Sequence, residues 1–413
     1  MAFLVPRRSP GGRGDRPWHV AVVVENVAVG VDTRLRKQVD DLLRAGYRLS
    51  VVTRRHPDND RYRDVPGMTL LEYPEPAEPG GAAGYLREYA VSFAWASWHL
   101  LRLRLRGRID VLQVCQPPDI YFPLTVLARW GGARVVVDQR DLMPELLASR
   151  YERPPRLMTR VLFWLERRTQ RSADHTLTVN DWLRQRLVAS GAAADRVTLV
   201  RNGPVLARVE RARADTALRG PHRHLVCWAG KMGRQDRVDL VLRVADLVVH
   251  GAGRRDCGFA VLGDGECLEE LREQVGQLGL APWVTVTGWL PEEQVFGYMA
   301  SSDVGLDTSL QAEVSPVKAM EYMASGLPLV SFDLPETRSI AEDAAVLVAP
   351  GDEQALADAV LRLLDDPDAR RELGAVGRER VHTWLAWERQ SQAYLAVVAP
   401  RTGSAAARTA VRR

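Results

Sequence analysis

Four consecutive residues, Ser315, Pro316, Val317 and Lys318, have the types that typically begin a helix. Serine is a common helix cap, and proline is favoured in the first turn. The backbone amides of Val317 and Lys318 would then lack partners within the helix, and together with the helix dipole they form a site for an anion such as a phosphate. The Lys318 ammonium adds a positive charge beside them. The alternative interpretation is an ordinary capped surface helix.

Two glutamates, Glu313 and Glu321, flank this helix start with seven residues between them. Glu321 would lie more than a turn along the helix, where its carboxylate can accept hydrogen bonds from two neighbouring hydroxyls, such as those of a ribose. Glu313, on the preceding loop, would face whatever extends beyond the phosphates. A lone pair of glutamates is usually solvated, but the whole ordered string favours a nucleotide site.

A second basic segment follows a strand that is expected to end at Gly230. Lys231, Arg234 and Arg237 are crowded into seven residues, and the glycine lets a phosphate approach the backbone. The segment therefore predicts a diphosphate-binding loop, with exposed arginines on an ordinary loop as the alternative. The chain has only three lysines, and two of them, Lys231 and Lys318, lie in the two candidate phosphate loops.

Other candidates follow the ends of expected strands. Trp289 comes just after one strand, where its ring or the nearby backbone could contact a base, or the ring could simply pack. Arg140 and Asp141 come after another, in a charge cluster with Asp138 and Glu145. This cluster is either part of a site or a helix cap.

Apolar runs of strand length alternate with helical stretches in two series, separated by a break near 204–222. This order predicts two doubly wound parallel α/β sheets in tandem. Ligands of such sheets lie beyond the carboxyl ends of the strands, so we expect a cleft there. The expected strands cover 19–26, 47–55, 111–115, 133–138, 175–180 and 197–203, then 224–230, 257–265, 283–289, 303–309, 327–333 and 345–352.

The composition of the 413 residues excludes several classes of protein. The chain is 46% apolar and 26% charged, and 32 glycines and 24 prolines punctuate it, which excludes wholesale disorder and a coiled-coil rod. A net charge of +4 does not favour a nucleic-acid partner. The four cysteines form no CxxC pair, so we expect neither zinc nor disulfides, and a reducing, cytoplasmic compartment.

Two further absences concern cofactors and membranes. The loop after the first strand has no GxGxxG pattern, which disfavours NAD and FAD, and no acidic cluster near the basic loops predicts a metal. The sequence shows no secretory signal and no apolar run of about 18 residues that would span a membrane.

As an ordered set, these segments resemble the retaining GT-B glycosyltransferases of family 4, the group 1 type, over roughly residues 19–398. SPVKAMEYMASGLPLV after Glu313 resembles the Glu-seven-Glu region of that family. Its neighbours in order are VVVDQRDLMPEL, VTLVRNGP, AGKMGRQDRVDLVL, VLGDGECL and VTVTGWLPEEQV. The resemblance implies the GT-B fold, in which two Rossmann-like domains face a central cleft. It also implies transfer of a sugar with retention of anomeric configuration.

The resemblance also implies a division of labour between the domains. After a disordered leader at 1–17, an N-terminal domain at 18–206 would bind the acceptor. A C-terminal domain at 207–383 would bind a nucleotide-diphospho-sugar, UDP- or GDP-linked. A helix at 384–398 would pack back on the first domain, before a disordered tail at 399–413.

Individual roles follow from the matching positions. The resemblance implies that Glu321 binds the ribose hydroxyls, that Glu313 orients the donor sugar, and that Lys231 meets the diphosphate in place of the family's usual arginine. We therefore take as candidate catalytic residues Glu313, Lys231, Arg140 and Asp141. The candidate donor-binding residues are Glu321, Lys318, Val317, Ser315, Arg234, Arg237, Gly230 and Trp289.

The sequence departs from the family pattern at two of these places. Asp236-Arg237 stands where a Lys-Gly pair is common, so Arg237 or Arg234 would supply the second phosphate cation. Arg140 stands where a histidine is common, which changes the proton chemistry on the acceptor side.

The predicted function is metal-independent and cofactor-free transfer of a sugar to a hydroxyl of a carbohydrate or lipid-linked acceptor, in polysaccharide, glycolipid or glycoconjugate biosynthesis. A non-catalytic nucleotide-sugar-binding subunit and a GT-B epimerase or phosphorylase remain as alternatives.

Two basic, tryptophan-containing stretches, 94–108 and 153–171, could lie on anionic lipid at the inner face of the plasma membrane. The alternative is a solvated face over a packed core.

Overall fold

The computed structural model describes residues 16–74, 81–150, 155–311, 313 and 315–399, and its chain divides into two compact units. Unit 1 comprises Met1–Val179, Leu183–Val200 and Ser391–Arg413, and unit 2 comprises Asn180–Trp182 and Arg201–Gln390. The leader expected at 1–17 and the tail expected at 399–413 lie outside the described residues, apart from 16, 17 and 399.

Unit 1 is built on a seven-stranded parallel sheet in the order β3-β2-β1-β4-β5-β6-β7. Its strands are β1 (His19–Val23), β2 (Arg48–Arg54), β3 (Met68–Tyr73), β4 (Val111–Gln116), β5 (Arg134–Gln139), β6 (His175–Thr178) and β7 (Val197–Leu199). The central strands β1 and β4 are buried along their whole length because helices cover both faces of the sheet, which explains why most of their residues are apolar.

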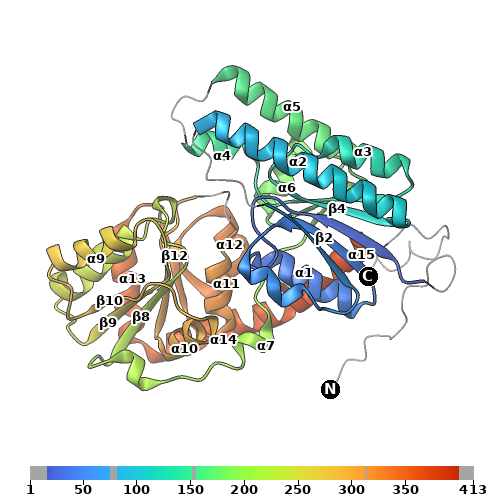
Figure 1. The fold of residues 1–413 in the computed structure, drawn as a ribbon. Coiled ribbons are helices and arrows are strands. Elements are labelled where there is room, and N and C mark those ends of the chain that lie inside the picture. The colour runs from blue at the N-terminus through green and yellow to red at the C-terminus, as the bar shows by residue number, and fades with distance from the viewer. Residues whose placement is uncertain (1–15, 75–80, 151–154, 312, 314, 400–413) are drawn as a thin grey trace. The chain divides into compact units, whose positions relative to one another are not determined.

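The helices of unit 1 lie on both sides of this sheet (Figure 1). Helices α2, α3 and α5 lie on one side, and α1 and the end of α15 on the other. The bounds are α1 (Thr33–Arg44), α2 (Gly81–Arg106), α3 (Phe122–Trp130), α4 (Met143–Arg150), α5 (Arg156–Ser172), α6 (Asp181–Ala189) and α15 (Trp387–Val398).

Unit 2 contains a six-stranded parallel sheet in the order β10-β9-β8-β11-β12-β13. Its strands are β8 (His224–Ala229), β9 (Cys257–Leu262), β10 (Val284–Val286), β11 (Val304–Asp307), β12 (Leu329–Phe332) and β13 (Ala345–Val348). Its helices are α7 (Leu206–Val209), α8 (Asp239–Asp246), α9 (Leu268–Gln277), α10 (Glu292–Ser301), α11 (Val317–Ala324), α12 (Pro335–Ala341), α13 (Glu353–Asp365) and α14 (Pro367–Arg380).

Strand β8 illustrates how the core of unit 2 is divided. Val226 and Trp228 point to the cluster packed by α8 and α13, whereas Leu225 and Cys227 point to the cluster packed by α10 and α11. Successive side chains of a strand point to opposite faces, so a strand covered on both faces is apolar at most of its positions.

The structure confirms two doubly wound parallel sheets, with one strand that the sequence interpretation missed. That strand, β3, lies at the edge of the sheet, and its MTLLEY sequence is only partly buried. The chain passes from unit 1 to unit 2 at Val200–Arg201, just before the boundary expected at 206–207, and returns at Gln390–Ser391. Among the described helices, none combines the length and apolar character that crossing a bilayer needs.

The end of α15 belongs to unit 1 by its contacts. Tyr394 is fully buried, and its hydroxyl donates a hydrogen bond of 2.9 Å to the Gln113 side-chain oxygen on β4. The Arg134 guanidinium on β5 donates to the carbonyl oxygen of Ala399 at 2.8 Å. The last turns of the chain therefore help to close the core of unit 1.

Replacing Tyr394 with phenylalanine should lower the free energy of unfolding of unit 1 by about 1–3 kcal/mol, because the buried Gln113 oxygen loses this donor. Denaturant unfolding measures the change. Tyr298→Phe, on a partly buried ring of α10, is the matched control and should shift stability by less than about 0.5 kcal/mol. Equal stability of the two variants would contradict the assigned role of the Tyr394 hydroxyl.

Candidate functional site

A cavity of about 370 Å³ opens at the carboxyl edge of the unit 2 sheet. Loops that follow β8, β9, β10 and β11 line it, together with the start of α11. The lining includes seven of the predicted residues, Gly230, Lys231, Trp289, Ser315, Val317, Lys318 and Glu321. Segments that are far apart in the sequence thus meet at the carboxyl edge of the sheet, because its strands are parallel.

Glycines let the loops at this edge approach one another closely. A side chain at Gly263, which has a φ of +133°, would collide with the carbonyl oxygen of Gly230. A Cβ at Gly230 would lie 3.2 Å from the Cε of Lys318 and 3.3 Å from the ring of Trp228. Gly230 thus leaves room for the Lys318 side chain, and Gly263 is required for packing between backbones.

Lys318 is the more confined of the two lysines that line this cavity. Its side chain is 14% exposed, and its ammonium lies 4.3 Å from the centre of the buried Trp228 ring, an arrangement typical of a cation–π contact. The Nζ atom is 3.6 Å from Asp307 and 3.9 Å from Asp236 and makes no hydrogen bond among the described residues. A buried ammonium without hydrogen bonds is suited to a further anionic ligand.

The two aspartates beside Lys318 were not predicted as site residues. Asp307 ends β11 and Asp236 lies within the basic loop after β8, and both line the cavity. Burial raises the pKa of Asp236 above its ordinary value, while the Lys318 ammonium opposes that rise. Each is an isolated acid in the sequence, so only the fold brings them to the same lysine.

The start of α11 differs from the expected geometry. The helix begins at Val317 with Pro316 in the cap position, and the Ser315 side chain makes no capping hydrogen bond. Pro316 has φ −79° and ψ 69°, which are the angles of an inverse γ-turn, and the Val317 amide donates to the Ser315 carbonyl oxygen at 2.9 Å. The prediction of Ser315 as the cap and of a free Val317 amide is therefore wrong, because the tight turn uses that amide.

Ser315 and Glu321 nevertheless line the cavity. The Ser315 hydroxyl oxygen is buried without a hydrogen-bond partner among the described residues, so it remains available to a ligand. Glu321 lies one turn further along α11 and is half-buried. Ser315, Lys318 and Glu321 therefore all line the cavity, and the Ser315 hydroxyl is available to a ligand where the Val317 amide was expected to be.

Arg234 and Arg237 do not line this cavity. Arg237 has a left-handed backbone with φ 49°, and its guanidinium pairs with Asp239 at 2.9 Å. Arg234 is largely exposed and lies 3.8 Å from Glu270. Both line a different cavity beside α9, so the cations that the structure brings to the main cavity are Lys231 and Lys318.

Glu313 lies on the loop before α11, where its backbone carbonyl oxygen accepts a hydrogen bond of 2.7 Å from the Asn180 side chain. It is half-buried and does not contribute to the cavity lining. Trp289, by contrast, is 72% exposed at the cavity, which leaves its ring accessible to a ligand.

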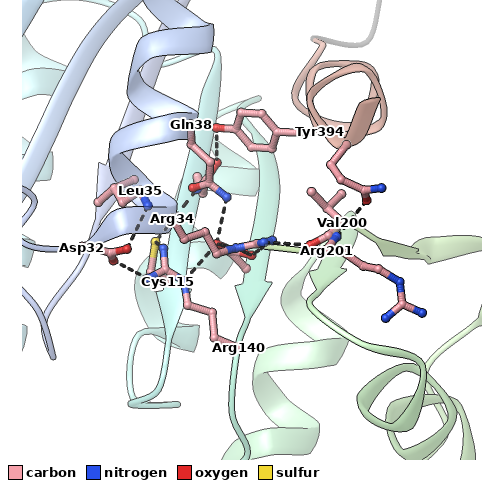
Figure 2. Close-up of polar contacts among 12 residues, drawn as sticks. Asp32, Arg34, Leu35, Gln38, Cys115, Arg140, Val200, Arg201 and Tyr394 are labelled. Atoms are coloured by element: carbon pink, nitrogen blue, oxygen red, sulfur yellow. Dashed lines mark hydrogen bonds and ion pairs between the residues drawn. The ribbon is translucent and has the colours of Figure 1, made fainter. Parts of the chain in front are cut away.

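The charge cluster predicted in unit 1 is a buried ion-pair network (Figure 2). Asp138, at the end of β5, accepts hydrogen bonds from the Arg34 guanidinium at 2.9 Å and from Arg140 at 3.1 Å. Arg140 also pairs with Asp32, which caps α1 through the Leu35 amide. The network ties α1 to the end of β5.

The network shifts the pKa values of Asp138 and Arg140 away from neutral pH, so both groups stay charged. Burial alone would raise the pKa of Asp138, but the Arg34 and Arg140 guanidiniums outweigh it and hold that pKa well below its usual range. Burial would lower the pKa of Arg140, but Asp32 outweighs it and raises that pKa well above its ordinary value. Arg140 therefore keeps its proton, whereas Asp141 lies exposed next to it.

Two models of glycosyltransferase families match the chain. The model described as glycosyl transferases group 1 matches residues 223–366, and the model described as a glycosyl transferase 4-like domain matches 29–203. The alpha-D-kanosaminyltransferase of Streptomyces kanamyceticus is 28% identical over 385 residues, which cover 86% of this chain and 91% of that protein.

Solved structures share the fold. HepE of Anabaena in complex with UDP-glucose superimposes with a TM-score of 0.69 at 14% identity, over 91% of this chain and 98% of that one. WaaG, described as a glycosyltransferase involved in lipopolysaccharide biosynthesis, does so with a TM-score of 0.69 at 16% identity, over 93% and 100% of the two chains. These likenesses establish the GT-B fold.

Replacing Asp138 with asparagine should lower the free energy of unfolding by about 3–5 kcal/mol at neutral pH, because Arg34 and Arg140 lose their buried counter-charge. The folded-state pKa is depressed, so this stabilisation is present above the unfolded pKa of about 3.9 and is lost as the pH falls. Urea unfolding of both proteins should show the difference shrinking below that pH. A gap that stays constant with pH would contradict the ion-pair assignment.

Replacing Lys318 with methionine should weaken binding of UDP at least about tenfold, because the cavity loses its most confined cation and keeps Asp236 and Asp307. Calorimetry on the folded variant measures the affinity. Arg243→Met, on the exposed face of α8, is the control and should bind UDP like the parent protein. Unchanged affinity in the Lys318 variant would remove Lys318 from the site.

Proposed function

Because this chain belongs to the group 1 glycosyltransferases of family 4, we propose that the unit 2 cavity binds the nucleoside diphosphate part of the sugar donor. The chain is a nucleotide-sugar-dependent, retaining glycosyltransferase with the GT-B fold. The observation that carries the proposal is the convergence of Lys231, Lys318 and Glu321 on one cavity at the carboxyl edge of a parallel sheet.

Each of these groups has a proposed part in donor binding. Lys231 and Lys318 bind the diphosphate, with the Ser315 hydroxyl as a further donor. Glu321 accepts hydrogen bonds from the ribose hydroxyls, and the exposed Trp289 ring contacts the base. A cavity of about 370 Å³ is within the usual range for a small-molecule ligand.

The chemistry follows from charge. Breaking the bond between the sugar and the phosphate builds negative charge on the departing diphosphate, and fixed cations aimed at that charge lower the barrier by a few kcal/mol each. Lys318 is suited to this role because it is buried, where an electrostatic interaction is stronger than in water. Lys231 adds a second cation, and Glu313 orients the donor sugar.

We propose that the reaction needs no divalent cation. The two lysines supply the positive charge that a metal ion would otherwise provide at the diphosphate. In the described part of the chain, no group of three or more histidine, cysteine or acidic residues could hold a metal ion.

The donor and acceptor are proposed from relatives and from the two units. HepE of Anabaena was solved with UDP-glucose, so a UDP-sugar is the first donor to test, with GDP-sugars second. Unit 1 would bind the acceptor, a hydroxyl of a carbohydrate or of a lipid-linked glycan, in glycan or glycolipid biosynthesis. The four cysteines are all free thiols, which is consistent with a reducing, cytoplasmic location.

The sequence suggested Arg140 as a catalytic residue, but we propose only an electrostatic and positioning role for it. Its guanidinium keeps its proton and is engaged by Asp32 and Asp138, so it cannot act as a general base or acid. It would contribute a fixed positive charge and orient the end of β5. Exposed Asp141 remains a candidate for contact with the acceptor.

The experiment that tests the function is release of nucleoside diphosphate from UDP-, GDP- and dTDP-sugars without added metal. We expect slow hydrolysis of one donor, and the Glu313→Gln variant should lose at least about tenfold of that rate while keeping its UDP affinity, because Glu313 acts on the sugar. Glu273→Gln, exposed on α9, is the matched control and should keep full activity.

Two outcomes would oppose the proposal. Failure of every nucleoside diphosphate to bind would contradict the nucleotide-sugar site. Tight binding of UDP with no turnover in the presence of carbohydrate and lipid-linked acceptors would favour a subunit that binds donor without catalysis.

A further inference from the structure

Three helices of unit 1 carry large apolar side chains on their solvent-facing sides. Leu105 of α2, Trp130 of α3 and Leu157 of α5 are 78%, 81% and 75% exposed. Trp98 of α2 and Trp164 of α5 are about half exposed. Contiguous exposed apolar side chains of this size usually mark an interaction surface.

These side chains lie on neighbouring helices, and we call the exposed residues of α2, α3 and α5 the tryptophan face. The end of α2 lies beside the end of α3, where the Arg108 guanidinium is 3.5 Å from the carbonyl oxygen of Gly132. Helix α3 lies beside α5, where the Phe122 and Trp164 rings meet edge to face at 5.5 Å. Figure 1 shows the three helices on the same side of the sheet.

The charge of the tryptophan face is almost entirely positive. The sequences of α2, α3 and α5 contain ten arginines and only two acids, Glu88 and Glu166. Glu166 is buried, so it does not offset the surface charge. Arginines also lie over the exposed rings, with Arg102 5.9 Å from the centre of Trp98 and Arg168 5.3 Å from the centre of Trp164.

This combination fits the interface of an anionic bilayer better than a second copy of the chain. Tryptophan rings are favoured at the level of lipid headgroups, and arginines can insert their apolar stems while the guanidinium meets phosphate. Each basic residue near an anionic surface contributes about 1 kcal/mol. Two copies packed face to face would instead place the arginines of one copy against those of the other.

The geometry also fits a helix layer that lies on a membrane. Helix α2 has 26 residues and is therefore about 39 Å long. Helices α2 and α3 follow β3 and β4, so both begin near the carboxyl edge of the sheet, where unit 1 is expected to bind its acceptor. If α2 and α3 rest on the membrane surface, the carboxyl edge of the unit 1 sheet lies near the lipid headgroups.

We infer that the tryptophan face docks unit 1 on a bilayer containing anionic lipids, which places the acceptor edge where a lipid-linked glycan can reach it. The docking surface uses no residue of the donor cavity. Membrane binding and donor binding can therefore fail independently of one another.

The test is flotation of the full chain with vesicles of phosphatidylcholine alone and of phosphatidylcholine mixed with phosphatidylglycerol. The parent protein should float with the mixed vesicles, and high salt should release it, because ions screen the arginines. The variant Trp98→Ser/Leu105→Gln/Trp130→Ser should bind the mixed vesicles at least about tenfold more weakly. All three positions are exposed or half-exposed, and UDP affinity should stay unchanged, which shows that the variant is folded.

A second variant, Arg102→Gln/Arg106→Gln/Arg160→Gln, changes exposed arginines and should also lose binding and its salt dependence. The matched control, Val376→Ser/Arg243→Gln/Arg362→Gln, changes exposed residues of unit 2 and should float like the parent protein.

Several outcomes would overturn the inference. The parent protein could fail to bind vesicles that contain phosphatidylglycerol. The variants of the tryptophan face could also bind these vesicles as tightly as the parent protein does. A parent protein that self-associates, with monomers restored by the apolar variant, would assign the tryptophan face to a second copy instead.

Discussion

The carboxyl ends of parallel strands must meet at one edge of a sheet, and this constraint places every group of the candidate donor site. Lys231 follows β8, Asp307 ends β11, and the turn before α11 follows β11. Lys231 is far in the sequence from the segment that follows β11, yet they share a cavity because the strands run in the same direction. Gly230 and Gly263 then allow the loops to come close enough for the cavity to form.

The environment of Lys318 explains how such a cavity can be stable and still bind an anion. The ammonium lies over the Trp228 ring, and Asp236 and Asp307 supply negative charge at 3.6–3.9 Å, too far for a hydrogen bond. These groups offset part of the cost of burying the charge. A diphosphate oxygen at hydrogen-bonding distance would interact more strongly, so the ligand would complete an environment that the protein leaves incomplete.

The sequence predicts groups well when the spacing along one element determines their position. Lys318 and Glu321 are three residues apart on a single helix, and both line the cavity as their helical spacing indicates. Continuous apolar runs such as β1 predict strands covered on both faces. The partly buried edge strand β3 lacks that signal and was missed.

Other features depend on backbone angles or on contacts that no local pattern records. Arg237 adopts a left-handed backbone, and its side chain pairs with Asp239 rather than pointing into the cavity. The γ-turn at Pro316 uses the Val317 amide that a regular helix start would leave free. Asp236 and Asp307 lie near the same lysine only because two strands are neighbours in the fold.

The network around Asp138 shows why a cluster of charges at a strand end needs its partners to be interpreted. The DQRD sequence has the residue types of a catalytic site, yet the structure pairs Asp138 with Arg34 and Arg140 and pairs Arg140 with Asp32. A carboxylate held ionised between two guanidiniums cannot exchange a proton near neutral pH, and neither can the guanidiniums. The end of β5 is therefore fixed in charge and position, and any proton transfer at this edge of the unit 1 sheet must involve groups outside this network.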